Sequence, residues 1–543
     1  MMSFSAMTFI SRLLGLVREI VIAYVFGANS TTDAFWVAFR IPNFMRRLFA
    51  EGSFSTAFVP VFTEVKQTRS HAELKALVAR VAGALGGVLL IVTAIGVLGS
   101  DWLTAAFSPG AIDEPEKFRL TSDLLRITFP FLLFVSLTAL AGGVLNSFDR
   151  FALPAITPVV LNLCMIAGAL WLAPRLATPI MALGWSILLA GVLQLLLQFP
   201  ALARLDLLTW PRWAGAQVPR RPGMAESGRW AWTHPDVRRI LKLMLPTLFG
   251  SSIAQINLLL DTLIASFLIA GSQTWLAQTD RLLEFPLGIF GVALGTVILP
   301  SLSRHHVATD REGFSRALDW GLRTALLIAV PAMLGLVILA KPMVATLFQH
   351  GRFTADDVDM AGLSLAALSL GLPAFALVKV VAPAFYARQD TRTPVRAGVV
   401  AMVANMLMNV AFVAILFALW RQPDDLAGGW LAGIARVPGL HAGLALASAL
   451  ASYLNLWLLW RSLRREGIFV RQPGWSKHFA RLALASAALA AVLLVGVSFW
   501  SDWSAWSTAV RIERLTVLIG AAGLAYVGAL LAAGLRLRDL RGT

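Results

Sequence analysis

The amino-acid sequence predicts an all-α polytopic membrane protein. Hydrophobic residues make up 58% of the 543 residues and charged residues only 14%, whereas a soluble core of this size needs far less apolar material. The mean hydropathy is +0.73. Apolar stretches of about 20 residues, the length that crosses a bilayer, recur along the whole chain. These observations predict about fourteen transmembrane helices.

The predicted spans differ in regularity. The second and eighth are long and contain proline, so we expect them to bend. The first carries charged residues and is followed by no small-residue cleavage site, so we expect a retained helix rather than a signal peptide. The spans lie near residues 4–27, 32–65, 80–100, 122–146, 153–173, 179–202, 240–270, 275–303, 318–341, 358–386, 395–419, 440–460, 479–500 and 513–535.

Basic residues are concentrated in a few connecting segments. Segment 203–242 holds eight Lys or Arg against three acids, and segment 461–481 holds six against one. With fourteen spans these segments fall on one side, and the positive-inside rule places that side and both termini in the cytoplasm. The net charge of +16 lies in connecting segments such as these and in a few sites within the spans. It therefore favours contact with anionic membrane lipids, and we expect no nucleic-acid partner. The single Cys164 excludes a disulfide and a cysteine-based metal site.

The sequence also contains a duplication. A shift of about 241 residues aligns "AFSPG" with "LFQHG" and "NSFDRFALP" with "ARQDTRTP". Asp149 and Asp390 then lie 241 apart, and Pro60 and Pro300 lie 240 apart. Several landmarks at one offset indicate an internal repeat.

The repeat predicts the domain organisation. We expect an N-lobe at 1–205 with spans 1–6, a basic cytoplasmic linker at 206–238, a C-lobe at 239–465 with spans 7–12, and spans 13–14 at 466–543. Both six-helix lobes begin on the same side, so they are related in parallel. Transporters built this way bind substrate between the halves and alternate access by rocking.

Charged residues inside the predicted spans mark a candidate site. A charge at mid-bilayer costs roughly 2.5–3.5 kcal/mol, so such residues usually have a function. The alternative for several of them is that their side chains reach the headgroup region. The candidates fall in spans 1, 2, 7 and 8: Arg12, Arg18, Glu19, Asp33, Arg40, Arg46, Arg47, Glu51, Asp261, Asp280, Arg281 and Glu284.

The excess of arginine indicates the class of substrate. A guanidinium binds phosphate oxygens in bidentate fashion and stays ionised when poorly solvated, so clustered arginines suit a diphosphate. A cationic drug would require acids instead. Within span 2, Asp33, Arg40 and Arg47 recur every seven residues, so helical spacing favours Arg47 over Arg46 as the residue on this face.

Several longer motifs are more specific. They are "SRLLGLVREIVIAYVFGANSTTDAFWVAFRIPNFMRRLFAEGSFSTAFVP", "DRLLEFPLGIFGVALGTVILPSLS", "AFYARQDTRTP" and "QPGW". Together they resemble the MurJ (MviN) lipid II flippases of the MOP transporter superfamily, and the resemblance covers essentially the whole chain. It implies a transporter, not an enzyme, in the bacterial cytoplasmic (inner) membrane. Its implied activity moves undecaprenyl-diphosphate-MurNAc-pentapeptide-GlcNAc to the outer leaflet for peptidoglycan synthesis and cell shape.

The resemblance also implies roles for particular residues. It assigns diphosphate binding to Arg12, Arg18, Arg46 and Arg281, and supporting roles to the acids Glu19, Asp33 and Glu284. It thus prefers Arg46 where helical spacing favours Arg47. Spans 13 and 14 are implied to form a groove for the lipid tail, and peptidoglycan synthesis proteins are implied as further partners.

The resemblance further implies a sodium ion, with no other cofactor. Its ligands would be Asp261, Asn405 and Asn409. Asn409 is neutral where an acid is expected, and the alternative is that these oxygens pack between helices.

Three alternative functions remain open from the sequence. They are a flippase for another polyprenyl-diphosphate-linked saccharide, a MATE-like cation or drug antiporter, and a membrane glycosyltransferase using the acids of "ADDVD" at 355–359. Helix capping explains those acids more simply. No G-x-x-x-x-G-K-[ST] motif is present, so we expect electrical or ionic driving of transport rather than nucleotide hydrolysis.

Overall fold

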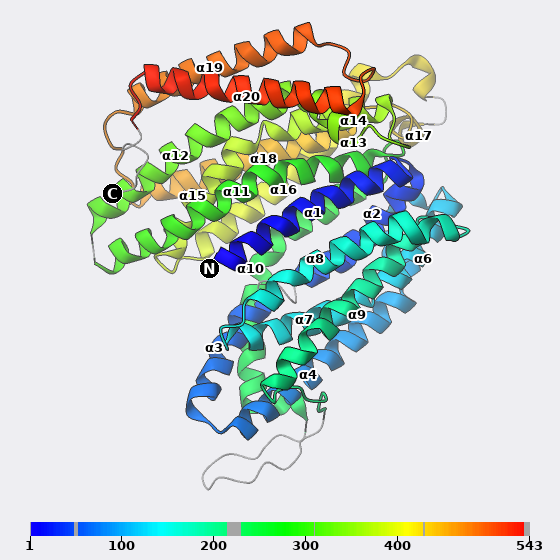
Figure 1. Ribbon diagram of the computed structural model, residues 1–543, viewed down its shortest axis with the longest axis vertical. Coiled ribbons are helices and arrows are strands. Elements are labelled where there is room, and N and C mark those ends of the chain that lie inside the picture. The colour runs from blue at the N-terminus through cyan, green and yellow to red at the C-terminus, as the bar shows by residue number, and fades with distance from the viewer. Residues whose placement is uncertain (1, 48–52, 214–229, 309, 427–428, 537–543) are drawn as a thin grey trace. The chain divides into compact units, whose positions relative to one another are not determined.

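The computed structural model describes all residues except 1, 48–52, 214–229, 309, 427–428 and 537–543 (Figure 1). The described residues form helices and no β-strand, which confirms the all-α prediction. Glu51 and residues 214–229 of the predicted linker lie outside them. The α-helices are α1 (Met2–Phe26), α2 (Ser30–Arg46), α3 (Ser53–Thr68), α4 (His71–Leu98), α5 (Ser100–Phe107), α6 (Pro115–Thr128), α7 (Phe131–Asn146), α8 (Ala152–Ala167), α9 (Met181–Arg204), α10 (Pro235–Ala265), α11 (Ser272–Val307), α12 (Arg311–Ile338), α13 (Ala340–Phe348), α14 (Ala355–Ser369), α15 (Leu372–Tyr386), α16 (Arg392–Trp420), α17 (Trp430–Ile434), α18 (His441–Arg465), α19 (Trp475–Phe499) and α20 (Thr508–Ala532).

The chain forms two compact units, 1–266 and 267–543. In the first unit, α10 packs on α2, α3, α4 and α5. In the predicted organisation, this helix is instead the first span of the C-lobe, which begins at residue 239. The boundary between the two compact units therefore lies one helix after the predicted linker. The two six-helix lobes, as the parts that move during transport, stay a prediction.

Ten helices or helix pairs in the described part of the chain are long and apolar enough to cross a membrane. They correspond to predicted spans 3–6 and 9–14. The remaining four predicted spans correspond to α1, α2 with α3, α10 and α11. These four carry all the charged residues of the candidate site, whereas the total of fourteen crossings stays a prediction.

The helix boundaries repeat at the predicted offset. Helices α4 and α12 begin 240 residues apart, and so do α6 and α14, and α8 and α16. Proteins in which each half contains the same succession of elements arise by duplication. The helix boundaries thus support the internal repeat in addition to the short motifs found in the sequence.

The turn before the fifth helical segment of each half shows the repeat most sharply. Asp149 and Gln389 both adopt a left-handed backbone, with φ of 59° and 60°, which is uncommon for residues other than glycine. The next residue closes each turn, with Arg150 N–H donating to Leu145 O at 3.0 Å. The structure therefore pairs Asp149 with Gln389, one residue before the Asp390 that the sequence comparison chose.

The last two helices, α19 and α20, pack on each other and on α12 and α13 (Figure 1). Arg511 at the start of α20 is buried and donates to the carbonyl oxygens of Ala345 at 2.9 Å and Ser504 at 2.8 Å. The Tyr526 hydroxyl donates to Leu327 O at 2.6 Å. These bonds satisfy buried polar groups, and they fix the terminal helix pair to the second unit.

The acids of 355–359 form a helix N-terminus. Thr354 Oγ accepts from Asp357 N–H, and the Asp357 carboxylate accepts from Thr354 N–H at 2.8 Å. Asp357 also accepts from the Trp275 indole N–H at 3.0 Å. This capping box uses the carboxylate structurally, as the sequence analysis expected, and it removes the motivation for a glycosyltransferase site.

Candidate substrate-binding residues

Two buried candidate charges lie on α1, which packs on α8 in the first unit. Arg18 is 7% exposed and Glu19 is 3% exposed, and the two side chains form an ion pair. Arg18 Nη1 donates to Asn162 Oδ1 on α8 at 3.1 Å. Asn162 in turn donates through Nδ2 to Ser11 O at 3.1 Å. Asn162 therefore links Arg18 to the backbone of its own helix and fixes the direction of the guanidinium.

The Arg18–Glu19 pair is not fully satisfied. Among the described residues, Arg18 Nε and Glu19 Oε2 have no hydrogen-bond partner. Buried polar groups are nearly always hydrogen-bonded, and exceptions call for an explanation such as a ligand or a catalytic role. The arrangement can thus offer a guanidinium N–H to an additional anionic group.

Arg12 lies on the same helix as Arg18 and is half-buried. Its side chain makes no hydrogen bond or ion pair with the described part of the chain. A half-buried arginine of this kind keeps all five of its donors available. The role of Arg12 in diphosphate binding stays a prediction.

Arg40 on α2 and Arg47 directly after this helix both contact α10. Arg40 is buried and donates through Nη1 to Thr262 Oγ1 at 2.6 Å. Arg47, which directly follows the helix, donates through Nη1 to Gln255 Oε1 at 3.1 Å. Arg40 and Arg47, seven residues apart, therefore both lie against one helix. These contacts engage both side chains within the first unit.

Arg46 behaves differently from its neighbour. It is half-buried, and its Nε donates to Asn43 Oδ1 on its own helix at 3.0 Å. Asp33 is buried in the first turn of α2, where the helix dipole favours a negative charge. The structure thus gives Asp33 a structural explanation, whereas the role of Arg46 in binding stays a prediction.

In the second unit, Arg281 and Glu284 lie one turn apart on α11. Arg281 Nη1 and Glu284 Oε2 are 3.1 Å apart, with 26% and 55% of the side chains exposed. The two residues therefore form an ion pair within one helix, and their role in substrate binding stays a prediction. Exposed pairs of this kind contribute about 0–1 kcal/mol to stability. We therefore expect the protein to fold without this ion pair.

The predicted sodium ligands come from both units. Asp261 lies on α10 of the first unit, and Asn405 and Asn409 lie on α16 of the second. Both asparagines are buried, and Asn405 Nδ2 donates to Ser448 Oγ at 3.1 Å. Within the described residues, Asn405 Oδ1 has no hydrogen-bond partner and no cluster of three or more His, Cys, Asp or Glu could hold a metal. An oxygen donor of this type fits a hard cation.

Comparison with known proteins identifies the family. A family model described as "Lipid II flippase MurJ" matches residues 22–513. The chain is also 44% identical to a probable lipid II flippase MurJ of Vibrio cholerae, over 99% of this chain and 96% of that protein. The chain belongs to the MurJ family of lipid II flippases. The family is one of transporters, so the predictions of a non-enzyme and of a multi-pass inner-membrane protein are confirmed.

Other relatives agree with this assignment. A MurJ lipid II flippase of Burkholderia cenocepacia is 39% identical over 95% of this chain and 92% of its own. A solved MurJ structure in an inward closed conformation has a TM-score of 0.73 and 25% identity, and covers 98% of this chain and 100% of that one. An inward-facing MATE multidrug transporter has a TM-score of 0.59 at 13% identity, over 86% of this chain and 98% of that one. That likeness shows the shared MOP fold alone, so the antiporter alternative is not favoured over MurJ.

The structure adds one residue that the sequence analysis missed. Asn162 is buried and holds Arg18. Its signal in the sequence is an amide inside the otherwise apolar stretch 153–173. Such an amide must find a partner in hydrocarbon, so it could have been identified as a residue with a buried partner, although not as the partner of Arg18.

Proposed function

We propose that the chain moves lipid II from the inner to the outer leaflet of the bacterial cytoplasmic membrane by alternating access. The observation that carries this proposal is the match to MurJ over residues 22–513. The buried Arg18, whose Nε has no partner among the described residues, supports it. A polyprenyl-diphosphate lipid presents phosphate oxygens that such a guanidinium can bind in bidentate fashion.

We assign contact with the diphosphate to Arg12, Arg18, Arg46 and Arg281. Glu19 and Glu284 support this assignment because each lies beside one of the arginines and limits where it can point. A carboxylate also keeps the arginine from being an isolated charge when no substrate is bound. Asn162 acts on the same step as a positioning residue for Arg18.

Transport is driven, on this proposal, by the membrane potential or by an ion. A potential negative inside favours export of negative charge by about 2.3 kcal/mol per charge per 100 mV. We assign a sodium ion to Asn405 and Asn409, because they share one face of α16 and Asn405 Oδ1 has no partner among the described residues. Replacing Na⁺ by K⁺ is then expected to lower the transport rate in the wild type but not in Asn405→Ala.

The remaining proposals concern orientation and partners. Both termini are placed in the cytoplasm, because the basic segments 203–242 and 461–481 then lie inside. Those segments would contact anionic membrane lipids. Helices α19 and α20 would guide the prenyl tail, and peptidoglycan synthesis proteins would receive the product.

The proposed function is tested by purified full-length protein in proteoliposomes with labelled lipid II. Transbilayer movement is expected above that of empty liposomes, and Arg18→Ala is expected to abolish it. A matched control is Arg126→Ala, because Arg126 is an exposed arginine of the same unit that pairs with Asp101 at 2.9 Å. Movement of another polyprenyl-diphosphate saccharide or of a cationic drug, with none of lipid II, would contradict the proposal.

A further inference from the structure

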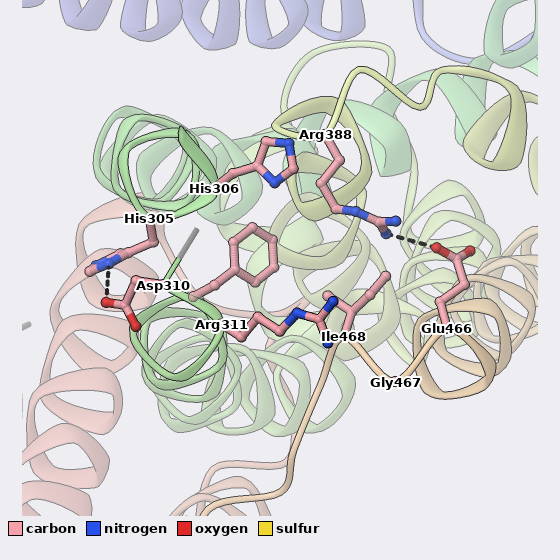
Figure 2. A pocket seen from close by; sticks show the side chains of 9 residues that line it. His305, His306, Asp310, Arg311, Arg388, Glu466, Gly467 and Ile468 are labelled. Carbon is pink, nitrogen blue, oxygen red and sulfur yellow. Dashed lines mark hydrogen bonds and ion pairs between the residues drawn. The ribbon is translucent and has the colours of Figure 1, made fainter. Parts of the chain in front are cut away.

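A pocket of about 260 Å³ lies in the second unit, away from the candidate residues described above (Figure 2). It is formed where α11 ends, where α12 begins, in the turn between α15 and α16, and directly after α18. Three of these helices, α12, α16 and α18, are candidate membrane spans that begin or end beside it. The pocket therefore lies at the level where a membrane span meets water, which is the level of lipid headgroups.

Two acids line this pocket, and both are engaged. Asp310 caps α12 by accepting from Gly313 N–H at 2.8 Å, and it pairs with His305 at 3.0 Å. These bonds, first the one from Gly313 N–H, lower the pKa of Asp310 below its ordinary value. Glu466 accepts from Arg388 Nη1 at 2.8 Å. Neither carboxylate is therefore a free negative charge that would repel an anion.

The nitrogen donors of the pocket are only partly used. Arg311 and His306 make no hydrogen bond or ion pair with any described residue, although both line the pocket. Arg388 gives one donor to Glu466 and retains the others of its fork. Figure 2 shows Arg311, Arg388 and His306 entering the pocket from different segments of the chain. The pocket is therefore lined by cationic side chains and has N–H donors that no described residue uses.

Apolar side chains complete the lining. Phe314, buried on the first turns of α12, and Ile468, in the segment after α18, both contact the pocket. Its volume of about 260 Å³ lies below the range of roughly 300–1,000 Å³ that holds a drug-sized ligand. The space thus suits one small anionic group with an apolar attachment.

We propose that this pocket binds the phosphate group of an anionic membrane phospholipid, with Arg311 and Arg388 as its main donors and Phe314 and Ile468 against the glycerol. Guanidinium forks match phosphate geometry, and the position at the ends of three spans supplies the lipid. Free phosphate shares this chemistry, and the test below separates the two sources. The inference concerns binding only and stands whether or not the chain transports lipid II.

The experiment titrates the purified full-length protein with phosphatidylglycerol and, separately, phosphatidylcholine, and counts bound lipids by native mass spectrometry. In the double variant Arg311→Gln/Arg388→Gln, one phosphatidylglycerol is expected to bind about tenfold or more weakly than in the wild type. The reason is that hydrogen bonds to charged groups are strong. The control Arg316→Gln removes an arginine that lies on the same helix and pairs with Glu312 at 2.6 Å outside the pocket. It is expected to bind like the wild type.

A charge-preserving variant, a folding check and a competition with inorganic phosphate complete the experiment. Arg311→Lys keeps the charge without the fork, so it should bind between the wild type and the double variant, and thermal unfolding should show that each variant is folded. Inorganic phosphate, followed by ³¹P NMR, should compete only at far higher concentration than the lipid. Equal phosphatidylglycerol binding by the wild type and the double variant would overturn the site. Phosphate binding as tightly as the lipid would overturn the lipid source.

Discussion

The same pair of residue types, arginine with glutamate, occurs on α1 of the first unit and on α11 of the second. The Arg18–Glu19 pair is almost fully buried and held by Asn162, whereas 26% of Arg281 and 55% of Glu284 are exposed. Breaking a buried pair leaves an uncompensated charge, while an exposed pair contributes little to stability. On the proposal that both arginines bind the substrate, we expect folding and binding to be coupled at Arg18 and separable at Arg281.

The largest effect is expected for Arg18→Ala. Leaving Glu19 buried and unpaired should cost about 3–5 kcal/mol of stability and should abolish transport. Complementation of growth in a strain depleted of its own flippase, with membrane levels measured in parallel, tests this. The double variant Arg18→Ala/Glu19→Ala should recover the level without recovering growth. Growth restored by the double variant would show that Arg18 serves folding alone.

Arg281→Ala should separate the two effects. Because the side chain is partly exposed, the free energy of unfolding should change only by what an exposed ion pair contributes, about 0–1 kcal/mol. Complementation should nevertheless fail, and Arg281→Lys should restore it poorly because an ammonium lacks the bidentate fork. If Arg281→Ala supports normal growth, the second unit contributes no arginine to the site.

Asn162→Ala tests whether positioning matters at the buried pair. Removing the bond to Arg18 at 3.1 Å should lower the transport rate about tenfold, since bonds to charged groups are worth about 1.5–3 kcal/mol. Asn162→Gln, which keeps the amide on a longer side chain, should retain more activity. Transport rates measured in proteoliposomes at matched protein levels give the comparison. Identical rates for Asn162→Ala and the wild type would remove the positioning role.

The smallest difference is expected between Arg46 and Arg47. Arg47 is engaged with Gln255 on α10, so Arg47→Ala should mainly lower the unfolding temperature. Arg46→Ala should mainly lower transport if the family resemblance assigns the site correctly. Measuring both quantities for both variants decides between the family assignment and helical spacing, and the reverse pattern would favour Arg47.

Much of this organisation could be predicted because it depends on local patterns. Apolar length identified the helices, and the repeat appeared as an offset between short motifs such as those around Asp149 and Asp390. The seven-residue spacing of Arg40 and Arg47 placed both on one face, and both meet α10. Periodicity is visible in one segment of sequence and needs no knowledge of its neighbours.

Tertiary contacts could not be predicted in the same way. Asn162 meets Arg18 from 144 residues away, and Thr262 meets Arg40 from 222 residues away. Which helix faces which depends on packing of the whole unit, and a single sequence does not encode it locally. The packing of α10 on helices of the first unit likewise could not be predicted from the sequence alone.

The central claim is that this chain moves lipid II by means of Arg18 and is driven without nucleotide hydrolysis. The most direct measurement follows labelled lipid II in proteoliposomes of the wild type and of Arg18→Ala/Glu19→Ala, with and without an imposed potential and with and without ATP. The account predicts movement by the wild type that rises with the potential, and none by the double variant. Movement that ignores the potential and requires ATP, or equal movement by both proteins, would contradict it.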